Sequence, residues 1–233
     1  MKLKFKFFCL FITGVFINQL YSQKGYDVER KAISIGSFKT LSVYSGIEVI
    51  LIPSDRNIGY IYGDNIENVI INIKRESLKI KRSVKSIFET GYNFVEIYFN
   101  KNIESIRAFQ GSIISVKKTI KQDNLNIRAK EGAKVSLKLD IKKHKATVTS
   151  GAKISYKGFS DEINLKVSTG GIINAEKLST QTAKVKVIAG GFASIKVEKF
   201  ADLNVTAGGK IEVYGKAEKI ITKHTLGGRI FFK

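Results

Sequence analysis

The C-terminal part of the chain repeats one short motif six times: Glu131-Gly132-Ala133-Lys134-Val135, Ser150-Gly151-Ala152-Lys153-Ile154, Thr169-Gly170-Gly171-Ile172-Ile173, Ala189-Gly190-Gly191-Phe192-Ala193, Ala207-Gly208-Gly209-Lys210-Ile211 and Leu226-Gly227-Gly228-Arg229-Ile230. Gln110-Gly111-Ser112-Ile113-Ile114 is a weaker, earlier copy. The residue after the first glycine stands at positions 112, 133, 152, 171, 191, 209 and 228, so successive copies are 18 to 21 residues apart. A period near 19 residues that continues to the end of the chain is typical of a solenoid.

Apolar residues alternate with polar ones on both sides of each motif. Ile163, Leu165 and Val167 precede Gly171 at every second position, and Ile173 follows it in the same phase. Side chains at alternate positions of a strand point to one side, so stacked coils would align these residues into one interior. The sequence therefore predicts an all-β fold, a right-handed parallel β-helix-like solenoid with coils of about 19 residues.

The paired glycines have a mechanical interpretation. A solenoid corner needs positive φ angles or a close approach of stacked backbones, and glycine permits both. A glycine-rich phosphate cradle is the functional alternative, but it needs a helix N-terminus, and no helical pattern follows these glycines. We therefore expect the glycines to serve the fold.

The first residues have the pattern of a secretory signal peptide, which we place at 1–22. Lys2, Lys4 and Lys6 form a basic region, the uncharged apolar stretch 7–20 follows, and Ser22 supplies a small residue at the expected cleavage point. A buried N-terminal helix is the alternative. The only cysteine, Cys9, lies inside this segment, so we expect a mature chain without thiols, disulfides or a transmembrane segment.

The remaining sequence divides into two parts. Residues 23–105 lack the regular motif but are rich in strand-forming residues, and we expect them to form a less regular β-rich part that caps the solenoid. Ser45-Gly46-Ile47 has the pattern of an early corner motif. Residues 106–233 carry the glycine-marked coils.

The chain is strongly basic, with 40 Lys and Arg against 20 Asp and Glu, a net charge of +20 that falls to +17 when Lys2, Lys4 and Lys6 are removed. Such a charge favours anionic partners, such as surface polysaccharide. The alternative is that it keeps a repetitive β protein soluble and blocks pairing of strand edges.

Two rows of residues recur at fixed positions on the outer faces. Five residues before each marker position stand Arg128, Thr147, Lys166, Lys186, Asn204 and Lys223, and one residue after it stand Lys134, Lys153, Ile172, Phe192, Lys210 and Arg229. The cations could follow the charges of an extended polymer, or could be the solvated face of any basic solenoid. Ile172 and Phe192 interrupt the second row with an apolar patch, which is a contact site or a shelf beneath a loop.

Nothing in the sequence has the pattern of a catalytic or metal site. His144 and His224 are the only histidines, and we expect both to face inward, four coils apart, as core or coil-end residues satisfied by backbone groups. The acidic residues of the coils occupy different positions and do not stack into a cluster, and no nucleophile elbow, P-loop or calcium repeat is present. We expect no enzyme, no cofactor and no metal.

The chain resembles the head GIN domain family of putative auto-transporter adhesins. The resemblance rests on the signal peptide, the strand pair 38–52 around Ser45-Gly46-Ile47, the turn Gly63-Asp64-Asn65, the strand Ser77-Leu78-Lys79-Ile80 and the glycine-marked coils, and it covers about 28–233. It implies a two-part, β-helix-like exported protein with an adhesive or surface role, and it implies no particular binding residues.

Three functions follow as hypotheses. The first is an exported, non-enzymatic, adhesin-like protein that contacts anionic cell-surface polysaccharide through its basic faces. The second is a periplasmic or envelope scaffold that acts through contacts with envelope proteins, and a polysaccharide lyase or hydrolase is the third. We expect no nucleic-acid partner, because export removes the usual targets, and we expect the protein in the periplasm, at the outer membrane surface or outside the cell.

Overall fold

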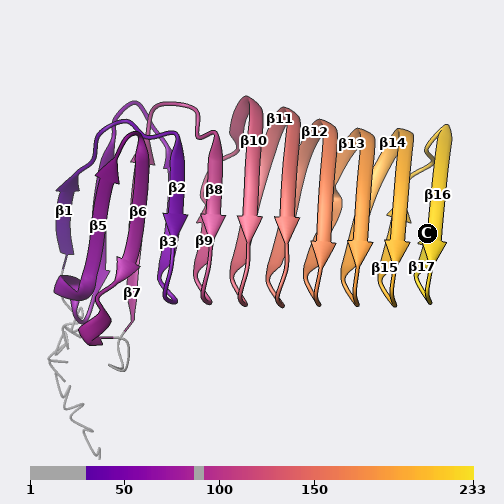
Figure 1. Ribbon diagram of the computed structural model, residues 1–233. Coiled ribbons are helices and arrows are strands. Elements are labelled where there is room, and N and C mark those ends of the chain that lie inside the picture. The colour runs from indigo at the N-terminus through magenta and orange to yellow at the C-terminus, as the bar shows by residue number, and fades with distance from the viewer. Residues whose placement is uncertain (1–29, 87–91) are drawn as a thin grey trace, which may run out of the picture.

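The computed structural model describes residues 30–86 and 92–233, so the expected signal peptide lies outside the described residues (Figure 1). The described chain is built of strands and two short 3-10 helices. The elements are β1 (Arg30–Ser34), β2 (Thr40–Val43), β3 (Glu48–Pro53), β4 (Ile58–Gly63), η1 (Ile66–Asn68), β5 (Val69–Lys74), β6 (Ser77–Arg82), η2 (Val84–Ser86), β7 (Asn93–Phe99), β8 (Ser105–Ala108), β9 (Ile113–Val116), β10 (Ile120–Ala129), β11 (Lys134–Val148), β12 (Lys153–Ser168), β13 (Ile172–Ile188), β14 (Phe192–Thr206), β15 (Lys210–Tyr214), β16 (Lys219–Thr225) and β17 (Arg229–Phe232).

Strands β8–β17 form a parallel solenoid in which equivalent residues of successive coils lie side by side. Val148 pairs with Val167, and the same column continues through Val187 to Val205. The coils advance away from the N-terminal part as a right-handed helix (Figure 1). The four valines of this column are fully buried, each with an exposed fraction of 0%. The predicted all-β solenoid and its period are confirmed.

Each glycine-marked corner is a tight turn that places two successive residues at positive φ. In the turn from Thr149 to Ala152, Ser150 has φ 54° and Gly151 has φ 70°, and the N–H of Ala152 donates to the Thr149 carbonyl at 3.3 Å. Two positive φ angles in the central pair define a type I′ turn. The Gly151 N–H also donates to the Thr169 carbonyl of the next coil at 3.2 Å, so the hydrogen-bond ladder continues around the corner.

The second glycine of the later motifs has a different role. A Cβ on Gly171 would lie 2.8 Å from the carbonyl oxygen of Val148, too close for any real side chain. Earlier coils carry Ala133 and Ala152 at the same position, and both are completely buried. The two expected uses of glycine are therefore divided between two positions, because the first supplies the turn and the second supplies room for the stacked backbone.

The N-terminal part contains one coil, formed by β2 and β3, that pairs on both sides with strands later in the sequence. Ser45 and Gly46 repeat the corner geometry, with φ 59° and 70°, as their pattern predicted. Strand β2 lies between β6 and β8, and β3 lies between β7 and β9, all in parallel. Beyond them β1, β4 and β5 pair antiparallel, which makes this part less regular, as expected, and covers the first coil (Figure 1).

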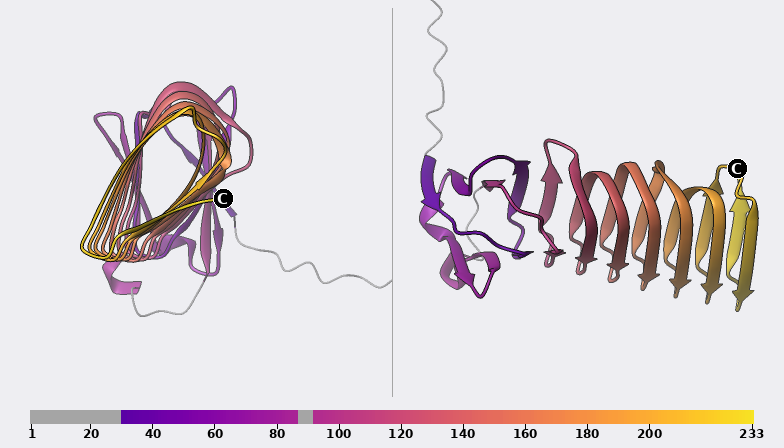
Figure 2. Two further views of the ribbon diagram at one scale, coloured as in Figure 1. Left: turned by 90° about the vertical axis from the view of Figure 1, so that its right-hand side faces the viewer. Right: turned by 90° about the horizontal axis from the view of Figure 1, so that it is seen from above.

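The two ends of the solenoid differ. Seen along the axis, the coils superpose on one outline that narrows to a corner, and the open last coil faces the viewer (Figure 2). All seven residues of β16 are exposed, and the exposed fractions of Leu226 and Phe232 reach 79% and 57%. Within the described ranges, no helix is long and apolar enough to cross a membrane.

Candidate functional site

The first predicted row lies on one continuous outer face. This front face, which is turned toward the viewer in Figure 1, consists of β6, β2, β8, the second halves of β10–β14 and β16. Arg128 pairs with Thr147, Thr147 with Lys166, and the same register continues through Lys186 and Asn204 to Lys223. The structure thus brings the predicted row together as a straight ladder.

The register extends this ladder into the N-terminal part. Arg107 on β8 pairs with Arg128, and Ser42 on β2 links Arg107 to Lys79 on β6. Neither cation was predicted, because Lys79 lies where the chain has no regular period and Arg107 precedes only the weak motif copy at position 112. We name as the front basic row the six cations Lys79, Arg107, Arg128, Lys166, Lys186 and Lys223.

The charges of the front basic row are not neutralised by the protein. Within residues 30–86 and 92–233, none of its six cations forms an ion pair with a carboxylate. Arg107 and Arg128 lie on neighbouring coils, as do Lys166 and Lys186, and neighbouring coils are about 4.8 Å apart, which is within the Debye length at physiological salt. A partner that supplies a line of negative charges would relieve this repulsion.

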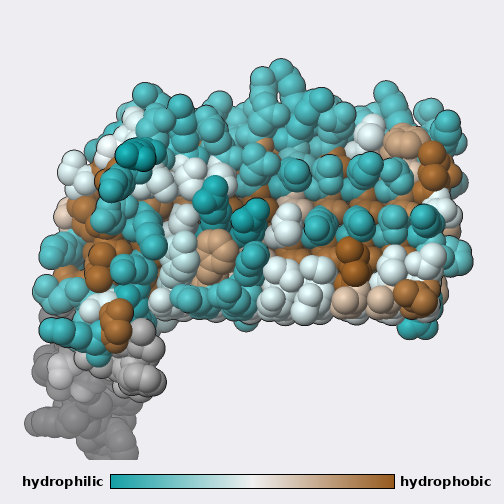
Figure 3. Space-filling view, in the orientation of Figure 1, coloured by the Kyte–Doolittle hydropathy of each residue, from teal (hydrophilic) through white to brown (hydrophobic). Residues whose placement is uncertain are grey.

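A shallow groove runs beside the front basic row. Two hollows of about 460 and 370 Å³ adjoin, because Asn126 and Lys145 line both. Hydrophilic side chains cover much of the upper part of this face (Figure 3). The 19-residue template contains these positions, since they alternate with the predicted inward residues, but they were not recognised as a site. The principal groove residues are Asn124, Asn126, Lys143, Lys145, Glu162, Asn164, Thr182, Lys184, Phe200 and Asp202.

Ion pairs between successive coils neutralise part of the groove. Lys143 lies 2.9 Å from the Glu162 carboxylate, and Lys184 lies 3.4 Å from that of Asp202. All four side chains are at least 36% exposed, so these pairs contribute little to stability. Their effect is to concentrate the uncompensated positive charge on Lys145 and on the front basic row.

The second predicted row lies on the opposite, back face. Lys134, Lys153, Ile172, Phe192, Lys210 and Arg229 are also in register, but they follow the corner turn instead of preceding it. Lys210 pairs with Glu212 at 2.6 Å, and its ammonium lies 5.6 Å from the Phe192 ring centre and 5.1 Å from that of Phe231. One extended polymer cannot lie along both rows. Two residues that are not cations interrupt each predicted row, but Ile172 and Phe192 of the back row are apolar, whereas Thr147 and Asn204 of the front row are polar.

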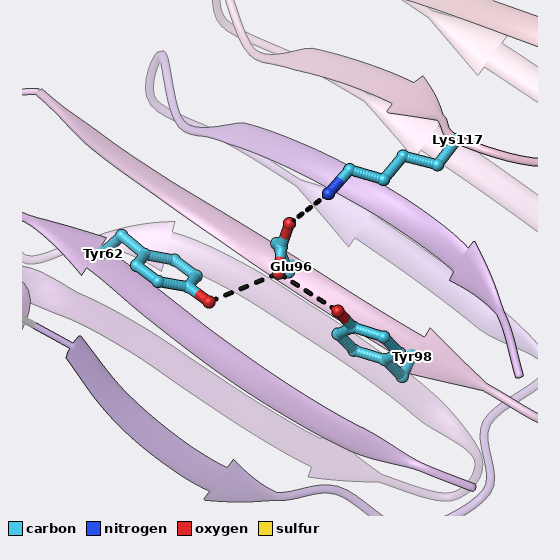
Figure 4. Close-up of polar contacts among 4 residues, drawn as sticks. All are labelled: Tyr62, Glu96, Tyr98 and Lys117. Atoms are coloured by element: carbon cyan, nitrogen blue, oxygen red, sulfur yellow. Dashed lines mark hydrogen bonds and ion pairs between the residues drawn. The ribbon is translucent and has the colours of Figure 1, made fainter.

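A buried carboxylate holds the N-terminal strands to the first coils on the back face. Glu96 on β7 is 8% exposed and accepts hydrogen bonds from the Tyr62 and Tyr98 hydroxyls, each at 3.3 Å. The Lys117 ammonium, just beyond β9, approaches its other oxygen to 2.7 Å (Figure 4). The sequence offered no signal for this cluster, because the antiparallel pairing of β4 with β7 creates it.

Two of the donors around Glu96, Lys117 and Tyr62, have raised pKa values. The hydrogen bond to Glu96 raises the pKa of Lys117, while burial, followed by the charge of Glu96, raises the pKa of Tyr62. Both groups therefore remain donors at neutral pH. A carboxylate that accepts hydrogen bonds from three side chains links the strands that carry them. We therefore assign this cluster a structural role.

The two histidines differ from each other in burial. His144 faces inward as expected and is 3% exposed, with its ring centre 4.6 Å from that of Tyr156. The expected satisfaction by backbone groups is wrong for His144, since neither ring nitrogen finds a hydrogen-bond partner within the described structure. His224 occupies an inward position of the last coil and is exposed at the open end. The described ranges contain no cluster of three metal-ligating side chains.

Comparison with known proteins identifies both a family and a fold. Residues 37–217 match the family model described as "Putative auto-transporter adhesin, head GIN domain". No curated protein matches the chain. A putative adhesin from Bacteroides fragilis superposes with a TM-score of 0.78 at 16% identity, over 89% of this chain and 98% of that one.

Two further solved structures have the same fold. A putative adhesin from Parabacteroides merdae has a TM-score of 0.72 at 15% identity, over 90% of this chain and 97% of that one. A putative lipid binding protein from Parabacteroides distasonis has a TM-score of 0.67 at 15% identity, over 90% and 98%. At these identities the likeness concerns the fold alone.

Proposed function

Because the chain belongs to the head GIN domain family of putative auto-transporter adhesins, we propose that it is an exported, non-catalytic, adhesin-like protein that binds anionic polymers at a cell surface. The front basic row is the proposed contact. Export follows from the signal-peptide pattern of 1–22.

The observation that carries this proposal is the line of six cations that have no carboxylate partner among residues 30–86 and 92–233. The positions of this row are stacked at about 4.8 Å per coil. Arg107 and Arg128 lie on neighbouring coils, as do Lys166 and Lys186, and the other successive cations are two coils apart. This arrangement suits a ligand that is extended and charged along its length. Strands hold the backbone of every member, so the ordering required on binding is confined to the side chains.

The test measures binding of the purified mature chain to an array of anionic and neutral glycans at low and at physiological salt. We expect selective binding to anionic glycans that persists at physiological salt. Replacing Arg128, Lys166 and Lys186 by Gln should abolish it and should reduce attachment of cells to coated surfaces. Binding that is absent, or that disappears when the salt concentration is raised, would contradict the proposal. The positive charge of the surface would then serve only to keep the protein soluble.

A protein partner is the second candidate, and the open end of the solenoid favours it. Exposed apolar side chains gather in the last coil, including Ile221 at 49%, Phe231 at 38% and Phe232 at 57%. An unpaired strand edge next to apolar side chains is a surface on which another chain can add. An envelope scaffold would remain in the periplasm after cell fractionation, whereas an adhesin would reach the surface fraction.

A further inference from the structure

We propose that the front groove binds an acidic polysaccharide, a polymer of uronic acid residues, laid along the solenoid axis. This inference rests on the proposed function and names the ligand class of the same face. The inference adds a set of residues, the Asn side chains of the groove, that would form hydrogen bonds with the hydroxyl groups of a sugar chain.

The direction of the groove defines the shape of its ligand. The two hollows extend from Thr40 on β2 to Asp202 on β14, and they share Asn126 and Lys145. The groove thus crosses successive coils and follows the front basic row. A ligand that fills both hollows must be extended along the solenoid axis, as a linear polymer is.

Amide and ammonium groups alternate along the groove. Asn126 pairs in register with Lys145, Lys145 with Asn164, and Asn164 with Lys184, so four successive coils present amide, cation, amide and cation. The side-chain amides of Asn126 and Asn164 are exposed and make no hydrogen bond within the described ranges. The groove therefore offers free amides at every second coil.

An amide matches a hydroxyl group better than it matches a phosphate. The Asn side chain both donates and accepts, and so does a sugar hydroxyl, whereas the oxygens of an ionised phosphodiester only accept. The neighbouring cations Arg128, Lys166 and Lys186 lie two residues further along the same strands and are free to pair with carboxylates. A polymer that carries both hydroxyls and carboxylates satisfies both sets.

One phenyl side chain completes the groove. Phe200 on β14 is half-buried and lines the same hollow as Asn164 and Lys184. A single ring suits the apolar face of one sugar. A single-stranded nucleic acid would instead need a series of rings on which successive bases stack, and Phe200 is the only Phe, Tyr or Trp among the residues that line the two hollows.

The experiment compares two polyanions, polygalacturonate and inorganic polyphosphate, at equal charge concentration and physiological salt. The groove variant carries Asn126→Ala and Asn164→Ala, and the row variant carries Lys166→Gln and Lys186→Gln. Lys134→Gln with Lys153→Gln removes the same charge from the back face and serves as the matched control. Thermal unfolding of each variant checks that the fold is retained.

We expect the groove variant to bind polygalacturonate about tenfold more weakly, because two hydrogen bonds are lost, and to bind polyphosphate unchanged. The row variant should weaken binding of both polymers, and the back-face control should weaken neither. Equal effects of the groove variant on both polymers, or none on either, would overturn the sugar-reading role while leaving the proposed function intact. A row variant that binds both polymers normally would overturn the proposed function as well.

Discussion

The two glycine positions of the corner motif meet different physical demands. Gly151 has a φ of 70°, and a Cβ at this position would have no atom within 4 Å, so only the backbone conformation favours glycine. Gly171 has ordinary backbone angles but faces the Val148 carbonyl oxygen across the coil interface. At the first position, the positive φ angle is energetically unfavourable for a residue with a side chain. At the second, a Cβ would collide with the backbone of the neighbouring coil, whose displacement is also unfavourable.

Alanine substitutions separate these demands. Gly151→Ala should lower the free energy of unfolding by about 1–2 kcal/mol, the cost of the left-handed region. Gly171→Ala should cost more, about 3 kcal/mol, since a methyl group must displace the neighbouring coil. Gly36→Ala, where a Cβ meets open space at an ordinary φ, is the control and should be neutral. Urea unfolding measures all three, and equal losses at residues 151 and 171 would contradict the distinction.

His144 makes stability depend on pH. Burial lowers its pKa to about 3 in the folded protein, against about 6.5 for an unperturbed histidine. Below pH 6.5 the unfolded chain takes up the proton more readily, so this contribution to stability is complete above pH 6.5 and is lost as the pH falls toward 3. At pH 5 the loss should be about 2 kcal/mol.

The variant His144→Leu should remove this loss, so that its free energy of unfolding changes less between pH 7 and pH 5 than that of the unaltered protein. His224→Leu, which replaces an exposed imidazole, is the matched control. An identical pH dependence for His144→Leu and the unaltered protein would show that the ring is not buried as described.

At the scale of elements, β7 joins antiparallel and parallel parts of the sheet, and Glu96 is its main polar anchor. Glu96→Ala removes the acceptor of Tyr62, Tyr98 and Lys117 together and should cost about 2 kcal/mol in unfolding free energy. Lys117→Gln should cost less than about 1 kcal/mol, because the Lys117 side chain is 55% exposed. Losses of equal size in denaturant titrations would contradict the anchoring role of the buried carboxylate.

The arrangement of elements could be predicted where the sequence repeats and not where it does not. The glycine period and the alternation around Gly171 predicted the ladder from Arg128 on β10, through β11–β14, to Lys223 on β16. The position of β2 and β3 could not be predicted, because Ser45 stacks on Gln110, 65 residues away. No local pattern indicates such a distant pairing, which depends on the antiparallel return of the chain through β4–β6.

The candidate site was predictable to a similar extent. Most cations of the front basic row followed from the period, whereas Lys79 lies where the period fails and Arg107 precedes a weak copy of the motif. The groove amides Asn126 and Asn164 lay at template positions, but their proximity to a hollow depends on the side chains around them. The missing partners of His144 could not be predicted either, since they depend on how the imidazole packs in the core.

At the scale of the whole molecule, the solenoid is a stack in which each coil is held by its neighbours. The N-terminal coil is covered by antiparallel strands, whereas β16 and β17 have a neighbour on one side only (Figure 1). In such a stack, local opening should begin at the uncovered end. Hydrogen exchange followed by mass spectrometry should find the amides of β16 and β17 least protected and those of β12 and β13 most protected, and uniform protection would contradict this view.

An anionic polymer that lies on the front face should shield the lysines there, and lysine footprinting measures this shielding. The mature protein is acylated with and without polygalacturonate, and the modified lysines are identified by mass spectrometry. We expect Lys145, Lys166 and Lys186 to lose reactivity when the polymer is present, while Lys134 and Lys153 on the back face keep theirs. Protection that is equal on both faces, or confined to the back face, would contradict this expectation.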